Sequence, residues 1–513
     1  MQPVDILVIA LYLAASAWLG LKLSGRQSDL RGYFLGNRDL PWWAVCLSVV
    51  ATETSALTVI SVPTIAYLGT TTFIQVAVGY LIGRVVVAFV LLPRYYRGEM
   101  TTAYAYLGER FGRGMQGTAS VAFLFTRLLA DGVRLFAAAI PMKVVLDGFG
   151  LELSFFAIIA ILGLVTVAYT LVGGIRAVVW VDVLQMCLYV VGGIIALVVI
   201  VQHVGGGFLA EAAAAGKTQV IDLSSNPISE PYALVTAVLG GALLSTASHG
   251  VDQIIVQRLL TCRSLADARR AVIGSAVVVF LQFALFLVVG LGLWSYYEGR
   301  SPEELGLQTG DQIFPTFIVE ALPAGLSGLL LAGIMASAMS TLSSSLSALS
   351  SSTVSDLVAQ LTTRPLADAA GLRLGRLITL GWGLVFIGAA ALFTGTDNPV
   401  VELGLSVAGL TYGGLLGAFF LGLWVRRARQ LDAIIGFAVA VATMSYLFLV
   451  EPELVGFTWY TAIGVVITLS LGFLLSRRHR EDSPLADQRG TLPDAPAGAA
   501  PGDTVGGTDQ GRR

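Results

Sequence analysis

Long apolar stretches alternate with short polar segments along most of the chain. A helix needs about 20 apolar residues to cross a bilayer, and thirteen windows reach roughly that length. The windows cover roughly residues 4–23, 42–68, 72–96, 118–145, 152–172, 177–202, 231–250, 270–297, 323–352, 373–394, 399–424, 431–450 and 456–476. Because membrane-spanning backbone must satisfy its own hydrogen bonds, we expect a helix in each window. The pattern predicts an all-α polytopic membrane protein with thirteen transmembrane helices.

Basic residues are concentrated in every second loop between these windows. The loop after the first window holds Arg26, Arg31 and Arg38, whereas Lys217 and Arg300 are nearly alone in the intervening loops. Cytoplasmic loops carry an excess of lysine and arginine. We therefore expect the N-terminus outside, the C-terminus inside, and a multi-pass location in a plasma (inner) membrane. Residues 477–513, rich in proline, glycine and alanine, predict a disordered cytoplasmic tail.

The composition limits the class of protein further. Of 513 residues, 56% are hydrophobic and 12% are charged, against about 25% charged in soluble domains. The three cysteines are scattered and predict neither disulfides nor a metal site. We find no nucleotide-binding, zinc or nucleophile motif, so we do not expect an enzyme. The basic loops are topology signals, so we expect no nucleic acid as a partner. We also expect the lipid bilayer and a small solute as partners, and no obligatory protein partner.

One apolar window ends in a run of hydroxyls between Ser337 and Ser352. Ser337, Ser340, Thr341 and Ser344 follow the i, i+3, i+4, i+7 pattern of one helix face, and Ser343 lies beside them. Hydroxyl oxygens offer lone pairs to a hard cation without adding charge. In a membrane protein, this face predicts a sodium site.

The second window carries a charge among several small polar residues. Glu53 lies within residues 51–58, and Pro63 follows. Intramembrane charges indicate function by default, and a broken helix frees carbonyls and helix ends to bind ions or solute. The alternative is a kinked helix whose polar side is packed against its neighbours.

The fourth window places Arg127, Asp131 and Arg134 on one helix face. Asp131 can pair with either arginine, which leaves one guanidinium to bind a solute carboxylate. A structural ladder of ion pairs is the alternative. Arg84, in the third window, is interpreted as a structural partner.

Two further groups have alternative interpretations. Asp182, about 8–9 Å from the inner end of the sixth window at about 1.5 Å per residue, is either a juxtamembrane charge or part of a cation site with the serine helix. His249, at the end of the seventh window, is by itself more typical of a helix-end hydrogen bond than of a ligand.

Several segments resemble the sodium/solute symporter family, which includes sodium–glucose, sodium–proline, sodium–sialic acid and sodium–iodide cotransporters. The resemblance covers about residues 5–450. It rests on the segments 36–38, 51–63, 173–185 (with Gly-Gly and Trp-x-Asp-x-x-Gln), 256–258 and 338–344 (Ala-Met-Ser-Thr-Leu-Ser-Ser).

The resemblance implies a leucine-transporter-like fold with two inverted five-helix repeats. The repeats would cover about residues 42–202 and 231–424 within a transmembrane symporter domain of residues 1–476. One extra helix would precede them and two would follow. The implied function is sodium-coupled secondary active symport of a small organic solute by alternating access.

The resemblance also implies ligands for one or two sodium ions. In the family, the main site uses carbonyls of the broken helix with a carbonyl and hydroxyls of the eighth repeat helix. The matching residues are Ala51, Thr54, Ser337, Ser340 and Thr341. Some members bind a second ion through an aspartate and serines, and here Asp182, Ser340, Ser343 and Ser344 match.

Solute-binding positions of the family match residues on several windows. They are Glu53, Ser55, Thr58, Phe73, Arg127, Asp131, Arg134, Ser248 and His249. Their mixture of acids and bases favours a carboxylate or a zwitterion, such as an amino acid or an organic acid, over a sugar. A proton-coupled or sugar symporter of the same fold is the alternative, and a non-transporting sensor or an ion channel is the alternative from another class.

Overall fold

The computed structural model describes residues 3–479 apart from 24–28, 55, 98–99, 149–152, 224–225, 227, 229, 231, 308, 362–367, 392–399, 452–453 and 457. Throughout this part of the chain the secondary structure is helical, and no strand is present. Leu40 and Cys262 form one isolated parallel bridge. The predicted all-α class is confirmed. The tail predicted for residues 477–513 lies outside the described residues from 480 onward.

The first half of the chain forms ten α-helices and two short helical turns. They are α1 (Pro3–Leu23), α2 (Leu30–Leu35), η1 (Gly36–Arg38), α3 (Trp42–Glu53), α4 (Ala56–Leu68), α5 (Ile74–Val86), η2 (Val87–Leu91), α6 (Leu92–Arg97), α7 (Ala105–Phe111), α8 (Arg113–Gly148), α9 (Phe155–Val204) and α10 (Phe208–Ala214).

The second half begins with a short π-helical turn and ends with α20. Its elements are η3 (Thr236–Gly240), α11 (Gly241–Gly250), α12 (Gln253–Leu259), α13 (Leu265–Tyr296), η4 (Gly310–Gln312), α14 (Ile313–Ala321), α15 (Leu326–Ser352), η5 (Thr353–Val358), α16 (Ala359–Leu361), α17 (Asp368–Ala391), α18 (Val400–Trp424), α19 (Gln430–Val450) and α20 (Trp459–Ser476).

Every predicted apolar window lies on one or more of these helices. Among the described residues, seven helices are long and apolar enough to cross a membrane, and the bent pair α3 and α4 makes an eighth. Three shorter apolar helices are Pro3–Ser16, Phe155–Leu171 and Gly409–Trp424. Helix α8 has the length of a span but carries three charges on one face. The multi-pass membrane character is therefore confirmed, while the number thirteen stays a prediction.

Three helix breaks interrupt the long helices. Helices α3 and α4 meet at an angle of 62°. Helix α9 kinks at Gly174, where φ is +56° and an added Cβ would lie 2.5 Å from the Tyr33 carbonyl oxygen. Glycine tolerates both the positive φ and the close approach. Helix α11 ends at Gly250, and α12 begins after Asp252, whose side chain accepts a hydrogen bond from the Ile254 amide (2.9 Å). The breaks at Thr54 and at Asp252 are buried in the bundle, since both side chains are fully buried.

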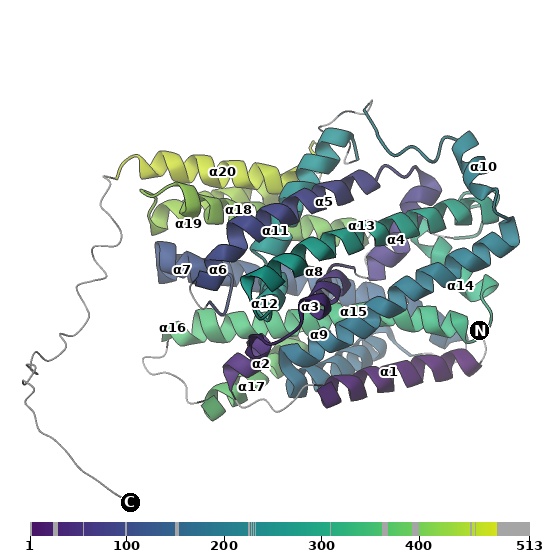
Figure 1. Cartoon of the computed structure of the whole chain (residues 1–513), viewed down its shortest axis with the longest axis horizontal. Coiled ribbons are helices and arrows are strands. Elements are labelled where there is room, and N and C mark those ends of the chain that lie inside the picture. The colour runs from purple at the N-terminus through teal and green to yellow at the C-terminus, as the bar shows by residue number, and fades with distance from the viewer. Residues whose placement is uncertain are drawn as a thin grey trace, which may run out of the picture.

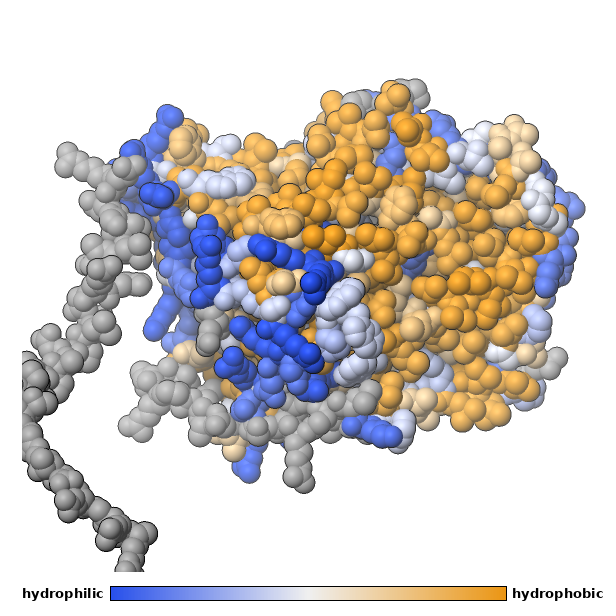
Figure 2. All heavy atoms as spheres, in the orientation of Figure 1, coloured by the Kyte–Doolittle hydropathy of each residue, from blue (hydrophilic) through white to orange (hydrophobic). Residues whose placement is uncertain are grey.

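The helices run mostly along the long axis of the molecule (Figure 1). The N-terminus lies at one end of the bundle, and the last turn of α20 lies at the opposite end (Figure 1). Apolar side chains cover a broad central band, with hydrophilic residues toward both ends (Figure 2). Small residues let helices approach closely, as at Gly413 of α18, where a Cβ would lie 2.6 Å from the Thr461 carbonyl of α20. This surface is typical of a protein whose central band contacts lipid.

Candidate functional site

The serine face of α15 lies inside the bundle and packs against α3, α8, α9 and α12. Residues 339–352 of this helix are all buried, although most of them are serine or threonine. Helix α3 ends at Glu53, and Thr54 is extended with φ −77° and ψ 92°. Because the helix ends there, the last carbonyls of α3, including that of Ala51, lack an amide of the next helical turn as hydrogen-bond donor. Oxygen atoms of two elements are available in one buried region.

Thr341 is the hydroxyl of this face whose hydrogen bonding is incomplete. Its side chain is buried, and its Oγ1 atom has no hydrogen-bond partner among the described residues. A buried hydroxyl without a partner loses its hydration without compensation. The donor chemistry suits a bare cation, which would be the missing partner. The Thr54 hydroxyl instead donates to Gln282 Oε1 (3.0 Å). The side chain of Ser337 lies outside the described residues.

Asp182 is the centre of a second buried network. Its carboxylate accepts hydrogen bonds from Ser340 of α15 (2.5 Å) and Ser48 of α3 (2.5 Å). Arg258 of α12 forms an ion pair with it at 3.0 Å, and both side chains are fully buried. The juxtamembrane interpretation of Asp182 is wrong, because α3, α12 and α15 enclose the carboxylate.

The three predicted serine ligands of Asp182 are not equivalent. Only Ser340 donates to the carboxylate, whereas Ser343 (3.0 Å) and Ser344 (2.5 Å) donate to the Ser340 carbonyl. Ser344 is also a hydrogen-bond acceptor for Arg258. The structure thus brings all three serines near Asp182, with the guanidinium of Arg258 inserted among them.

Glu53 lies at the end of α3 beside two residues of other helices. It forms an ion pair with Arg84 of α5, and His249 Nε2 of α11 lies 3.7 Å from Glu53 Oε2. Arg84 also donates to Ser275 of α13 (2.8 Å). This agrees with the structural role expected of Arg84. Ser248 contacts the other nitrogen of His249, with 2.8 Å between Ser248 Oγ and Nδ1.

The charged face of α8 forms a ladder that extends to α12. Asp131 lies 3.0 Å from Arg134 and 3.5 Å from Arg127. Arg127 also forms an ion pair with Asp252 and donates to the Tyr412 hydroxyl (2.5 Å). The expectation of one formally unpaired arginine is wrong, because Asp252, at the break between α11 and α12, supplies a second carboxylate.

The buried ion pairs described above contain as many acidic residues as arginines. The acids are Glu53, Asp131, Asp182 and Asp252, and the arginines are Arg84, Arg127, Arg134 and Arg258. Two of these side chains remain accessible, Arg134 at 18% and Glu53 at 17%, whereas the others are at 8% or less. Arg134 and Glu53 are therefore the charged side chains of these networks that solvent reaches most.

Aromatic residues lie close to this charged region. The ring of Phe73, at the start of α5, lies 5.5 Å from that of Tyr232 and 5.2 Å from that of Phe283. Tyr80 lies 6.3 Å from Phe283 and beneath the guanidinium of Arg84 (5.9 Å). Thr58 is partly buried on α4, and Ser55 lies outside the described residues.

Several residues of these networks were given no role from the sequence: Ser48, Asp252, Arg258, Ser275, Gln282 and Tyr412. Arg258 lies between the apolar residues Ile254–Val256 and Leu259, in the segment Val256-Gln257-Arg258 that carries part of the family resemblance, which is an available signal. Ser48, by contrast, is a single hydroxyl in an apolar window, and its contact with Asp182 spans 134 residues. No local pattern predicts such a contact.

The model of the sodium:solute symporter family matches residues 33–439. The chain belongs to the sodium:solute symporter family. It is 28% identical to a sodium/sialic acid symporter of Aliivibrio fischeri, over 90% of this chain and 91% of the relative. It is 30% identical to the human sodium/iodide cotransporter, over 85% of this chain and 68% of the relative.

Solved structures of symporters share the fold. A substrate-bound, outward-open sodium-coupled sialic acid symporter aligns with a TM-score of 0.83 and 25% identity, over 93% of this chain and 98% of that structure. A nucleobase–cation symporter in a closed conformation aligns with a TM-score of 0.58 and 14% identity, over 88% of this chain and 95% of that structure, which shows the fold alone. This sodium:solute symporter is therefore a multi-pass membrane transporter that uses sodium ions to drive solute movement. Membership of the family favours sodium over proton coupling, and transport over a sensor or channel function.

Proposed function

We propose that this symporter imports a small organic solute that carries a carboxylate, most simply a zwitterion, together with sodium. The observation that carries the proposal is the pair of accessible opposite charges, Arg134 and Glu53. A guanidinium binds carboxylates with paired hydrogen bonds, and Glu53 is suited to an ammonium group. The relatives named for sialic acid and for iodide show that anionic solutes occur in the family.

The proposed solute site includes the remaining predicted residues. Phe73 supplies an apolar wall, and Ser55, Thr58, Ser248 and His249 supply polar contacts. Asp131 and Arg127 would act by positioning Arg134, since they are linked to it through the ladder on α8. Asp131 would occupy one edge of the Arg134 guanidinium, and a solute carboxylate would bind the N–H donors of the other edge.

For the first sodium ion we propose the carbonyls of Ala51 and Thr54, the carbonyl of Ser337, and the hydroxyls of Ser340 and Thr341. This set joins the broken helix to α15. For a second ion we propose Asp182 with Ser340, Ser343 and Ser344. Two ions would move together with one solute if both sites are filled during the cycle.

The coupling then follows from the position of the first site. An ion held between α3 and α15 keeps the broken helix against the serine helix, which places Glu53 at the solute site. Loss of the ion to the cytoplasm releases α3 and the solute with it. A ligand shifts such an equilibrium only through unequal affinity for the two states. Two ions entering down about 100 mV supply about 4.6 kcal/mol, enough for roughly a thousandfold accumulation of a neutral solute.

We further propose the full topology expected for this function. Thirteen helices would form two inverted five-helix repeats at 42–202 and 231–424, with one helix before and two after them. The N-terminus would lie outside and the C-terminus in the cytoplasm, in a plasma (inner) membrane. The opposite positions of the N-terminus and the end of α20 support an odd number of spans (Figure 1).

A thermal-shift screen tests the solute class. Purified protein is heated with amino acids, organic acids without an amine, or neutral sugars, each with sodium and with potassium. We expect stabilisation by zwitterions or carboxylates that requires sodium. Stabilisation by neutral sugars but by none of the charged solutes would contradict the proposed class while leaving sodium coupling intact.

A further inference from the structure

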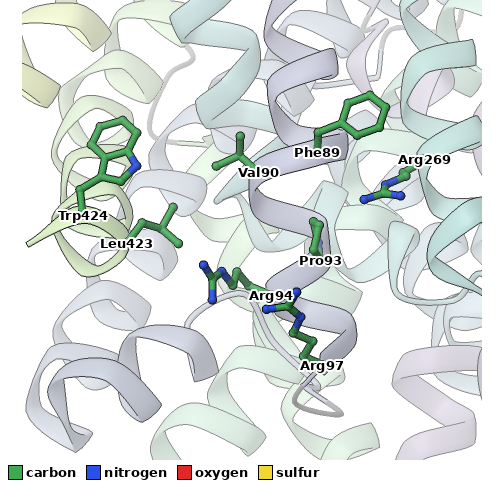
Figure 3. A pocket seen from close by; sticks show the side chains of 8 residues that line it. All are labelled: Phe89, Val90, Pro93, Arg94, Arg97, Arg269, Leu423 and Trp424. Carbon is green, nitrogen blue, oxygen red and sulfur yellow. The ribbon is translucent and has the colours of Figure 1, made fainter. Parts of the chain in front are cut away.

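Toward the end of the bundle opposite the N-terminus, where α6 and α7 lie (Figure 1), residues of α6 and α13 line a basic cavity. It has a volume of about 400 Å³ and lies between η2 and α6 on one side, α13 on another and the end of α18 on a third. Three arginines, Arg94, Arg97 and Arg269, line it together with apolar and aromatic side chains (Figure 3). No acidic residue lines the cavity within the described part of the chain.

Two of the three arginines form no hydrogen bond or ion pair within the described part of the chain. Arg94 and Arg97 are exposed, and neither makes a hydrogen bond or an ion pair with a described residue. Arg110, at the same end of the bundle, shows the contrast, because it donates to the carbonyls of Gly422 (3.1 Å) and Val425 (2.8 Å) at the end of α18. Arg94 and Arg97 therefore retain free donors that face a common space.

The third arginine is held in place. Arg269 Nε donates to the Ala88 carbonyl (2.9 Å), and its guanidinium lies 4.9 Å from the centre of the Phe89 ring. Ala88 belongs to the π-helical turn η2, a type of local distortion that often marks functional sites. Among the described residues its terminal nitrogens make no hydrogen bond, so the charge of Arg269 is held beside the cavity with donors to spare.

The remaining walls are apolar and open to the outside of the bundle. Phe89 is 58% exposed and Trp424 is 63% exposed, and they lie on opposite sides of the cavity (Figure 3). Val85, one turn before Phe89 on the same helix, is also exposed. Tryptophan concentrates at the boundary between hydrocarbon and water, which fits the place of Trp424, and Phe89 adds an apolar wall. The cavity thus combines free guanidinium groups with an apolar edge that continues toward the lipid-facing surface.

We propose that this cavity binds the phosphate group of an anionic phospholipid, with the acyl chains against Phe89 and Trp424. Phosphate is the shared chemistry of a lipid headgroup and of the free ion, and guanidinium groups recognise it through paired, charge-assisted hydrogen bonds. The apolar edge favours the lipid, since a free phosphate gains nothing from Phe89 or Trp424. Basic pockets between membrane helices are suited to anionic lipid headgroups.

Native mass spectrometry of the purified full chain tests the proposal. The protein is titrated with phosphatidylglycerol, with phosphatidylcholine and with inorganic phosphate. We expect tighter binding of phosphatidylglycerol than of phosphatidylcholine, because both carry the phosphate but the choline ammonium of phosphatidylcholine cancels its charge and is repelled by the three arginines. The double variant Arg94→Gln/Arg97→Gln should bind phosphatidylglycerol about 25-fold more weakly, since one basic residue near anionic lipid contributes about 1 kcal/mol, or about fivefold in affinity.

Arg270→Gln is the matched control, because Arg270 is the sequence neighbour of Arg269, is 66% exposed and lies 3.6 Å from Asp267. Its affinity should stay within about twofold of the parent protein. If the double variant fails to fold, the single variant Arg97→Gln should still weaken binding about fivefold. Equal binding of the two lipids by the parent protein, or an unchanged affinity in the folded arginine variants, would overturn the proposal. Complete displacement of phosphatidylglycerol by inorganic phosphate at millimolar concentration would assign the cavity to a free anion instead.

Discussion

Arg258 Nη2 lies 3.0 Å from Asp182 Oδ2, and both side chains are fully buried. The same guanidinium bonds Ser48 through Nε (2.9 Å) and Ser344 through Nη2. A cation that belongs to the chain therefore already compensates the carboxylate proposed to bind a second sodium ion. Sodium at this position must either share Asp182 with Arg258 or displace the guanidinium. A variant without Arg258 shows whether sodium can take the place of the guanidinium beside Asp182.

Removal of Arg258 should make the protein depend on sodium for stability. Arg258→Gln leaves Asp182 buried without a counter-charge. Removing one partner of a buried ion pair lowers the free energy of unfolding by about 3–5 kcal/mol. A sodium ion at the second site would replace the lost charge, so sodium should raise the melting temperature of the variant more than that of the parent protein. Thermal unfolding in sodium and in choline measures this. The double variant Arg258→Gln/Asp182→Asn should recover stability without sodium, and equal destabilisation of Arg258→Gln in both salts would contradict a cation site at Asp182.

Asp182→Asn tests the number of sodium ions. The amide keeps the size of the side chain but removes the charge that would hold the second ion. We expect the Hill coefficient for sodium in proteoliposome uptake to fall towards one, while uptake at saturating sodium stays measurable. Ser350→Ala, on the same helix but hydrogen-bonded to Thr379 of α17 (2.7 Å), should leave the coefficient unchanged. A coefficient of the parent protein already near one would indicate a single-ion cycle.

Thr341→Ala tests the first sodium site. Thr341 Oγ1 is buried and has no hydrogen-bond partner among the described residues, so its removal should cost little stability. We expect the sodium concentration for half-maximal uptake to rise at least about tenfold, since loss of one ligand oxygen at about 1.5 kcal/mol has that effect. Ser340→Ala should have the larger effect and abolish sodium-dependent uptake, because it removes the bond to Asp182 as well. Thermal unfolding shows whether each variant is folded, and normal sodium dependence in folded Thr341→Ala would exclude this residue as a ligand.

Most of the fold could be predicted from the sequence, because hydrophobic length sets where helices cross the bilayer. The serine face on residues 339–352 was also predictable, since a helical period alone places its hydroxyls together. The break after Glu53 was indicated by a run of polar residues in an apolar window. Local signals of this kind need no knowledge of neighbouring helices.

The pairing of charges could not be predicted, because it depends on contacts between distant segments. Asp131 was expected to leave one arginine unpaired, but Asp252 reaches Arg127 across 125 residues. Arg258 likewise reaches Asp182 across 76 residues. The count of spans stays a prediction. Helix α8 carries charges within its apolar stretch, and the apolar helices Pro3–Ser16, Phe155–Leu171 and Gly409–Trp424 are short among the described residues.

Arg134→Gln distinguishes a solute ligand from a structural ladder. Arg134 is the most accessible of the paired arginines on α8, at 18% against 8% for Arg127. If it binds a solute carboxylate, the variant should raise the apparent Kd for the solute about 10- to 100-fold, which corresponds to one charge-assisted hydrogen bond pair of about 1.5–3 kcal/mol. The sodium affinity measured without solute should change little. Arg127→Gln is the contrasting variant, because Arg127 joins Asp131, Asp252 and Tyr412 inside the bundle, and its loss should lower the melting temperature strongly. An equal effect of Arg134→Gln on solute and sodium binding, or a melting temperature as low as that of Arg127→Gln, would favour the ladder, in which Arg134 only neutralises Asp131.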